Sequence, residues 1–355
     1  MEEWMSSGLV QLGGAAAAVP RNMVPSSGPM QDGFGRRVEY LRISVTDKCN
    51  LRCVYCMPEE GLPWLRREQL LSFEEITQIV REMAELGLRR IRITGGEPLV
   101  RRDLPSLVRR LRSISGIEDI ALSTNGVLLE ELAEPLRRAG VDRINLSLDS
   151  LIPSRIDALS RRPGSAERIF AGIAAAERAG FAPLKINCVI MRGRNDDEIA
   201  ALAAITRQRP WHVRFIEVMP TGDNLPVSRD EYMPAAEILE CIRSLGELEP
   251  VKGPAGNGPA TYFAFPEAPG TVGVITPMSH NYCDRCNRMR LTADGHLRPC
   301  LFGSMQTNLR DPLRAGLPME PLIRETLRIK PERHWLVQGS DSGSGGLRAL
   351  SEVGG

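Results

Sequence analysis

The segment Cys49-Asn50-Leu51-Arg52-Cys53-Val54-Tyr55-Cys56 places three cysteines within eight residues, in a C-x3-C-x2-C spacing. This spacing is too tight for three independent core positions and is typical of a loop that wraps around one small inorganic group. Thiolates are soft ligands that suit iron–sulfur clusters or zinc. Because a cluster usually takes four thiolates, three would leave one metal position open for a cofactor or substrate. The spacing leaves two alternatives open, a structural zinc knuckle and a redox pair beside a buried cysteine.

Outward from this loop, strand-like and helix-like segments alternate along the chain. The strand pattern of residues 38–46 leads directly into the cysteines, and Ser72-Phe73-Glu74-Glu75 is a capping box that begins a helix. Further strands are expected at residues 89–94, 119–123, 143–148, 184–190 and 213–218, and helices at residues 73–86, 104–112, 129–139, 166–179 and 196–207. Six such units imply right-handed crossovers and a parallel sheet, whereas a closed barrel of this type needs eight. We therefore predict an α/β fold, an open partial (β/α)6 barrel of the TIM type whose gap is covered by the remainder of the chain.

Polar residues cluster where the expected strands end. They are Glu97, Ser123, Asn125, Ser147, Asp149 and Glu217. Active-site residues of a parallel barrel lie at the carboxyl ends of its strands, so these side chains are expected to line one site. Taken singly, each of them has a simpler interpretation as a helix cap or a turn.

From about residue 220 the alternation ends and an α+β region is expected, with a helix at residues 235–244 and a hairpin made by residues 261–265 and 271–275. A second group of cysteines follows in a C-x2-C-x13-C spacing, at Cys283, Cys286 and Cys300. Zinc is the stronger alternative here, because a histidine could complete a Cys3His site. The candidates for that fourth ligand are His280 and His296.

Two arginines stand beside the second group of cysteines. Arg288 and Arg290 alternate with Met289 and Leu291, so both could point to one side of a strand. A pair of guanidinium groups next to a metal with an open position would suit a polyphosphate anion.

Composition narrows the class of protein. The chain has 355 residues, a formal net charge of +1 and eight cysteines, of which six fall in the two groups. The near-neutral charge, and the lack of aromatic residues interleaved with basic ones, argue against nucleic acid binding. No apolar run reaches the roughly 20 residues of a transmembrane helix. Grouped cysteines indicate metal binding in an intracellular enzyme rather than disulfides, so a cytoplasmic location is expected. The only lysines are Lys48, Lys185, Lys252 and Lys330.

The patterns divide the chain into four expected regions. Residues 1–35 are rich in Gly, Ala, Ser and Pro and are expected to form a disordered extension. The partial barrel is expected over residues 36–245 and the region of the second group of cysteines over residues 246–338. Residues 339–355 are Gly/Ser-rich and, by composition alone, predict a flexible tail.

The first cysteine motif and Gly95-Gly96-Glu97-Pro98 together resemble the radical S-adenosylmethionine (SAM) superfamily. Within that superfamily, residues 38–355 resemble the GTP 3′,8-cyclase family of molybdenum cofactor biosynthesis. The motifs that carry this second resemblance are Thr46 to Pro58, Arg92 to Leu99, Arg214 to Pro220, the C-x2-C-N-R-x-R-L run from Cys283 to Leu291, and the terminal Gly354-Gly355.

The resemblance implies a role for each residue that matches a family motif. Two 4Fe–4S clusters would be held by Cys49, Cys53 and Cys56 and by Cys283, Cys286 and Cys300. SAM would bind the open iron of the first cluster and contact Tyr55, Gly96, Glu97, Ser147 and Met219. The guanine base of GTP would bind the open iron of the second cluster, and GTP would contact Arg42, Arg92, Ser123, Lys185, Arg214, Arg288 and Arg290. Catalysis would be assisted by Arg288, Arg290, Gly354 and Gly355, which replaces the interpretation of the tail as merely flexible. Threonine can stand at the position of Ser123 in the family, but the hydroxyl is kept.

The implied reaction is the reductive cleavage of SAM to a 5′-deoxyadenosyl radical, which abstracts the 3′ hydrogen of GTP. Bonding of C3′ to C8, followed by the uptake of a further electron and a proton, then gives 3′,8-cyclo-7,8-dihydro-GTP. The implied partners are GTP, an electron donor and the next enzyme of the molybdopterin pathway, without nucleic acid or membrane, and a homodimer is compatible with the sequence. The alternatives are another two-cluster radical SAM enzyme such as a peptide maturase, a zinc-dependent nucleic-acid-binding protein, and a structural zinc-knuckle protein.

Overall fold

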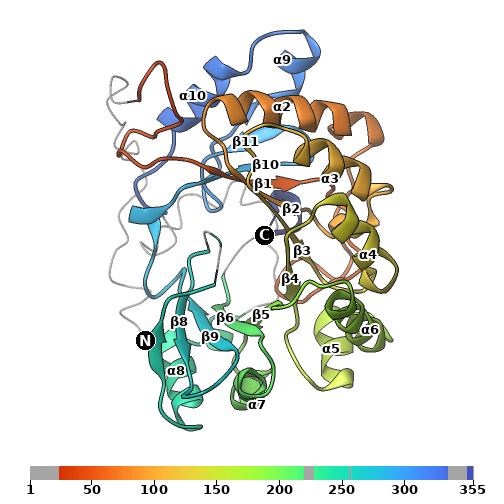
Figure 1. Cartoon of the computed structure of the whole chain (residues 1–355), viewed down its shortest axis with the longest axis vertical. Helices are drawn as coiled ribbons and strands as arrows, with labels where there is room; N and C mark the ends of the chain where they lie inside the picture. The colour runs from red at the N-terminus through yellow and green to blue at the C-terminus, as the bar shows by residue number, and fades with distance from the viewer. Residues whose placement is uncertain (1–23, 220–227, 255, 257, 335–349, 355) are drawn as a thin grey trace.

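The computed structural model describes residues 24–219, 228–254, 256, 258–334 and 350–354. Within them, one twelve-stranded sheet organises the fold, in the order β12-β11-β10-β1-β2-β3-β4-β5-β6-β9-β8-β7. Its central strands are parallel and follow the chain order: β1 (Tyr40–Ser44), β2 (Arg90–Thr94), β3 (Asp119–Thr124), β4 (Arg143–Ser147), β5 (Lys185–Ile190) and β6 (His212–Glu217). They form the curved wall seen in Figure 1, which confirms the predicted partial barrel.

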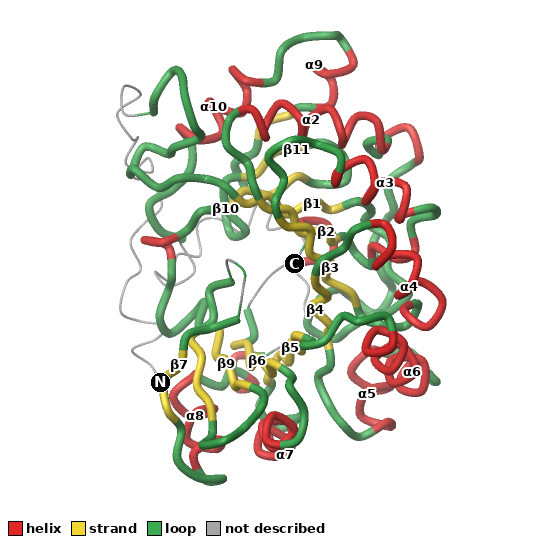
Figure 2. The backbone as a smooth tube through the Cα atoms, in the orientation of Figure 1, coloured by secondary structure: helices red, strands yellow, loops and turns green. Residues whose placement is uncertain are grey.

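Helices cover the outer face of this wall (Figure 2). They are α2 (Phe73–Glu85), α3 (Leu104–Arg112), α4 (Leu129–Ala139), α5 (Pro153–Ser160), α6 (Ser165–Arg178) and α7 (Ile199–Ala204). The expected capping box begins α2, because Ser72 Oγ accepts from the Glu75 N–H at 3.1 Å and Glu75 Oε2 accepts from the Ser72 N–H at 2.7 Å. The fully buried residues of α2 then recur at helical spacing as Ile76, Ile79, Val80 and Met83. Of these six helices, α5 alone is unexpected, and its eight residues are too few to show a clear period.

The C-terminal region extends the barrel wall at both edges. The predicted hairpin is present as β8 (Thr261–Ala264) and β9 (Thr271–Ile275), and β9 pairs in parallel with β6. At the other edge, β10 (Arg288–Leu291) pairs in parallel with β1. The remaining elements of this region are β7 (Glu249–Val251), β11 (His296–Arg298), β12 (Thr307–Asn308), α8 (Ala235–Arg243), α9 (Arg310–Arg314), α10 (Glu320–Arg328) and α11 (Leu350–Val353). The described strands of this region, β7 to β12, thus belong to the same sheet as the barrel. In the C-terminal region, α9, α10 and α11 are unexpected as well as α5.

Two glycines let the end of β2 lie against the segment that leads into the first cysteine loop. The Gly96 N–H donates to Thr46 O at 2.8 Å, and the next N–H, of Glu97, donates to Lys48 O at 2.8 Å. A Cβ atom on Gly95 would lie 2.6 Å from Thr46 O, and one on Gly96 would lie 2.4 Å from Lys48 O. Only glycine allows this approach, which fixes the start of the cysteine loop on two adjacent strands.

Residues 24–35 differ from the expected disordered extension. Met30 is 1% exposed and Asp32 is 0% exposed, and the Asp32 carboxylate binds the Arg36 guanidinium at 2.6 Å. Arg36 also donates to the carbonyl oxygens of Cys283 at 2.7 Å and Pro331 at 2.7 Å. The described part of the N-terminal segment is therefore fastened to the second group of cysteines. Residues 1–23 lie outside the described residues.

The expected tail is described only at its end. There α11 is a short helix in which Ser351 and Val353 are both 2% exposed. Residues 339–349 and Gly355 lie outside the described residues. In the part of the chain that the structure covers, no helix combines the length and apolar character needed to cross a membrane.

Candidate active site

The first cysteine group, Cys49, Cys53 and Cys56, lies in the loop after β1. Cys49 Sγ accepts from the Leu51 N–H at 3.4 Å and lies 3.9 Å from Asn125 Nδ2. Burial and the nearby Glu97 raise the pKa of Cys49 to about 11, and burial raises that of Cys56 to about 12. Thiols in such surroundings ionise when a bound metal supplies compensating positive charge. Free thiols with N–H groups directed at their sulfurs fit an iron–sulfur cluster.

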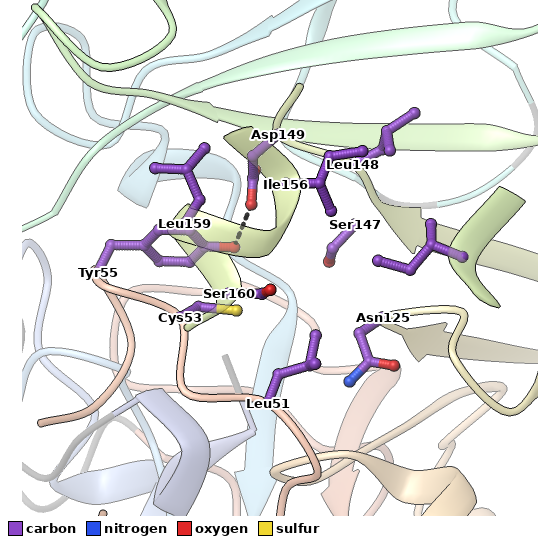
Figure 3. A pocket seen from close by; sticks show the side chains of 11 residues that line it. Leu51, Cys53, Tyr55, Asn125, Ser147, Leu148, Asp149, Ile156, Leu159 and Ser160 are labelled. Carbon is purple, nitrogen blue, oxygen red and sulfur yellow. Dashed lines mark hydrogen bonds between the residues drawn. The ribbon is translucent and has the colours of Figure 1, made fainter. Parts of the chain in front are cut away.

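A cavity of about 30 Å³ lies beside this loop, among the ends of β3 and β4 and residues of α5 and α6 (Figure 3). Tyr55 Oη donates a hydrogen bond to Asp149 Oδ2 at 2.9 Å, and Asp149 Oδ1 accepts from the Val189 N–H at 2.8 Å. Burial raises the pKa of Asp149 to about 6 and that of Tyr55 well above its usual value. Ser147 and Asn125 line the same cavity. The structure therefore brings two of the expected SAM contacts, Tyr55 and Ser147, to one place.

Two of the strand-end carboxylates serve the fold. Glu97 is 1% exposed, and its oxygens accept from the Leu99 N–H at 3.1 Å, Thr124 Oγ1 at 2.7 Å and the Asn125 N–H at 2.7 Å. Glu217 is 0% exposed and accepts from the N–H groups of Ala235 and Met278, both at 2.9 Å. Glu97 thus ties β2 to β3, and Glu217 caps the first turn of α8. For Glu217, the simpler interpretation as a helix cap describes its contacts.

Three arginines, here called the arginine layer, lie side by side on β10, β1 and β2. In the register of the sheet, Arg42 is directly opposite Arg290 on one side and Arg92 on the other. Burial and the charges of Arg290 and Arg92 lower the pKa of Arg42 well below its usual value. Burial and the neighbouring Arg288 lower the pKa of Arg290 to about 10. Among the described residues, the Nε atoms of Arg92 and Arg288 are buried without a hydrogen-bond partner. Such orphaned donors and mutual repulsion fit an anion that binds several guanidinium groups.

The positive charge continues along β5 and β6. Arg214 is 2% exposed and donates to Asn145 Oδ1 at 2.7 Å, and burial lowers its pKa to about 10. Lys185 is 6% exposed, and burial together with Arg214, Arg143 and Arg92 lowers its pKa to about 7. Lys185 lies directly opposite Asn145 of β4, and Asn145 lies opposite Ser123 of β3. The basic side chains therefore share one lining with the Ser123 hydroxyl.

The second cysteine group, Cys283, Cys286 and Cys300, lies on the segments around β10 and β11. Burial raises the pKa of Cys283. Burial acts in the same direction on Cys286, but the positive charges of Lys330 and Arg288 outweigh this effect, and the pKa of Cys286 is lowered. Of the two expected zinc ligands, His280 is exposed and His296 faces Asp294, with Nδ1 3.1 Å from Oδ2. Across the described residues, no three His, Cys, Asp or Glu side chains are arranged to hold a single metal ion. The geometry thus gives no support to a Cys3His zinc site.

The C-terminal residues connect the first cysteine group to the arginine layer. The backbone of Ser351 hydrogen bonds to Cys56, and Arg290 Nη1 donates to Gly354 O at 2.5 Å. Gly354 has φ of +70°, and a Cβ atom placed there would lie 2.6 Å from Thr94 Cγ2. Gly354 therefore lies against Ser44 of β1 and Thr94 of β2.

Three further residues expected in the site are Gly96, Met219 and Gly355. Gly96 and Met219 are half-buried after β2 and β6, and Gly355 lies outside the described residues. Sequence reasoning missed Lys330, which lies beside the second cysteine group, and the contact of Ser351 with Cys56. The rarity of lysine in this chain was the only available signal for Lys330.

Two family models together match most of the chain. The Radical SAM superfamily model matches residues 43–205, and the Molybdenum Cofactor Synthesis C model matches residues 211–336. The chain is 49% identical over 330 residues to a GTP 3′,8-cyclase of Pelotomaculum thermopropionicum, which covers 92% of this chain and 100% of that protein. A GTP 3′,8-cyclase of Moorella thermoacetica is 46% identical over 329 residues, with coverage of 92% and 100%.

Among solved structures, Streptococcus suis SuiB bound to S-adenosylmethionine is similar with a TM-score of 0.57 and 15% identity, over 78% of this chain and 65% of that one. At that identity the likeness shows a shared fold alone. The curated relatives go further, because they match the chain across both cysteine groups. The chain belongs to the GTP 3′,8-cyclase family of the radical SAM superfamily.

Proposed function

We propose that this chain is a GTP 3′,8-cyclase that converts GTP to 3′,8-cyclo-7,8-dihydro-GTP in molybdenum cofactor biosynthesis. The observation that carries the proposal is the arginine layer, three guanidinium groups in register on adjacent strands. A triphosphate carries several negative charges, which suit three guanidinium groups placed side by side. Family membership supports the same substrate.

The first cysteine group would hold a 4Fe–4S cluster, and SAM would bind beside Tyr55, Gly96, Glu97, Ser147 and Met219. When bound, this cluster and SAM supply the 5′-deoxyadenosyl radical that takes the 3′ hydrogen of GTP. Tyr55 and Ser147 line the cavity beside Cys53, so they can orient a ligand there. The second cysteine group would hold the other 4Fe–4S cluster, next to Arg288 on β10.

The remaining residues of the site would orient GTP. The arginine layer, with Arg214, Lys185 and Arg288, would anchor the triphosphate and so fix the ribose relative to the first cysteine group. Ser123 offers a hydroxyl on the same lining. Gly354 holds the chain end against Arg290, and with Gly355 it would exclude water from the reacting centre. The proposal also includes a one-electron donor, transfer of the product to the next enzyme of the pathway, a cytoplasmic location and a homodimer.

The test is an anaerobic incubation of the reconstituted protein with SAM, GTP and dithionite, analysed by mass spectrometry. We expect both 5′-deoxyadenosine and a cyclised GTP product. Deoxyadenosine without a GTP product would overturn the substrate and favour another two-cluster radical SAM enzyme. Neither product, with zinc bound in place of iron, would overturn the proposal entirely.

The affinity for GTP is expected to fall as the pH rises above 7. With its pKa lowered to about 7, Lys185 loses its charge above that pH when the site holds no GTP. Binding the triphosphate then requires the uptake of a proton, which weakens binding by up to about tenfold per pH unit. Equilibrium dialysis between about pH 7.5 and 9, where the terminal phosphate is already ionised, measures this slope. The Lys185→Met variant should bind more weakly at pH 7 and lose the slope. A wild-type affinity that stays constant over this range would contradict the assignment.

A further inference from the structure

One lysine is buried against the second cysteine group. Lys330 is 2% exposed and follows α10. Its Nζ atom donates to the carbonyl oxygen of Pro299 at 2.9 Å, to that of Arg288 at 3.1 Å, and to Cys286 Sγ at 3.4 Å. The three protons of the ammonium group are therefore all used.

These three acceptors come from three parts of the site. Cys286 supplies the central sulfur of the second cysteine group, Arg288 begins β10, and Pro299 directly precedes Cys300. A single ammonium thus ties one ligand sulfur to the backbone beside the next ligand and to the backbone of an expected GTP contact. Arginine could not replace it, because a planar guanidinium cannot direct three bonds from one atom.

The charge of Lys330 also requires an anion. A buried ammonium is costly unless an opposite charge lies near it. Among the described residues, the interactions of Lys330 are these three hydrogen bonds, and none of them is to a carboxylate. The one acceptor that can carry a full negative charge is the Cys286 sulfur. The residues around the second cysteine group thus fit a thiolate-bound cluster with a positive charge built in beside it.

We propose that Lys330 is a positioning residue that raises the reduction potential of the iron–sulfur cluster held by the second cysteine group. The inference rests on the proposed function in that it requires a cluster at Cys283, Cys286 and Cys300. A hydrogen bond to a ligand sulfur and a nearby positive charge both stabilise the reduced, more negative cluster. Through the Arg288 carbonyl, the same ammonium holds the start of β10 at a fixed place relative to that cluster.

The experiment is a redox titration of the anaerobic two-cluster protein, followed by electron paramagnetic resonance, for wild type and Lys330→Met. Methionine keeps the length and removes the charge and the N–H donors. At a fixed potential we expect the reduced-to-oxidised ratio of the second cluster to fall about tenfold, which is about 59 mV for a one-electron couple. The first cluster, identified by the response of its signal to added SAM, should be unchanged. Lys252→Met, the same substitution at an exposed lysine, is the matched control.

Two further outcomes keep the test decisive. If Lys330→Met fails to accumulate, Lys330→Gln keeps a donor without the charge and should still shift the second cluster in the same direction. A variant with wild-type iron content and an unchanged second potential would overturn the role of Lys330 while leaving the proposed function intact. A wild-type protein with only one cluster signal would instead overturn the assignment of the second cysteine group.

Discussion

Replacing Arg42 with methionine is expected to lower kcat/KM for GTP by roughly 100-fold or more, while the GTP-free protein keeps or gains thermal stability. Arg42 is the central member of the arginine layer, so it is the residue most affected by the repulsion within it. Removing one partner of a desolvated charge pair costs about 2–5 kcal/mol of binding, and ~1.4 kcal/mol is tenfold. Without GTP, the same change relieves a buried like-charge contact, so binding and stability should move in opposite directions.

The check is to measure steady-state kinetics with GTP alongside thermal unfolding without it. Arg138→Met is the matched control, because the Arg138 side chain on α4 is 71% exposed and should change neither quantity. A marked loss of thermal stability in Arg42→Met would show that the arginine is held by the fold itself. Unchanged kinetics would remove Arg42 from the GTP site.

Gly354→Ala is expected to lower the rate of GTP cyclisation by roughly 30-fold or more, with both clusters retained. A residue with a side chain pays about 1–2 kcal/mol for the left-handed backbone at φ +70°. Its Cβ would also lie 2.6 Å from Thr94 Cγ2 on a fully packed strand, and overpacking costs about 1–3 kcal/mol more. The chain end would then leave Arg290, so the reacting centre would lose its cover.

Matched variants separate the cost of the left-handed backbone from the cost of overpacking against Thr94. Gly316 has φ of +72°, and a Cβ atom added there would have no other atom within 4 Å, so Gly316→Ala carries the backbone cost in a place remote from the site. Thr94→Ser removes the Cγ2 atom, and in combination with Gly354→Ala it should restore part of the rate. Full activity of Gly354→Ala would show that the contact of Gly354 with Arg290 has no part in turnover.

The barrel could be predicted from the sequence because each of its units is local. The capping box at Ser72 and the apolar period of α2 specify that helix without reference to the rest of the chain. The spacing of the first cysteine group and the two glycines at 95 and 96 likewise depend on neighbours close in sequence. Alternation also predicts that Arg288 and Arg290 share one strand, and β10 confirms that prediction. Their roles toward GTP stay a proposal.

Pairings between segments far apart in the chain could not be predicted from the sequence. Nothing in residues 288–291 indicates that they join β1, so the register that places Arg290 opposite Arg42 had no local signal. The contact of Lys330 with Cys286 likewise joins residues far apart in the chain. Single strand-end residues were ambiguous for a different reason: Glu217 as a cap and Asp149 beside Tyr55 look alike in sequence, and only the surroundings distinguish them.

The pairing of β1 with β10 has a consequence for the order of assembly during translation. Tyr40 of β1 is synthesised long before its sheet partner Arg288 of β10, and β6 is likewise synthesised before its partner β9. Until those late strands emerge, the growing chain exposes a bare strand edge on each side, which favours association with other chains. Joining segments so distant in sequence is also slow. The arginine layer is completed only by this late step, so a nascent chain gains its site for a polyanion after most of the barrel has been made.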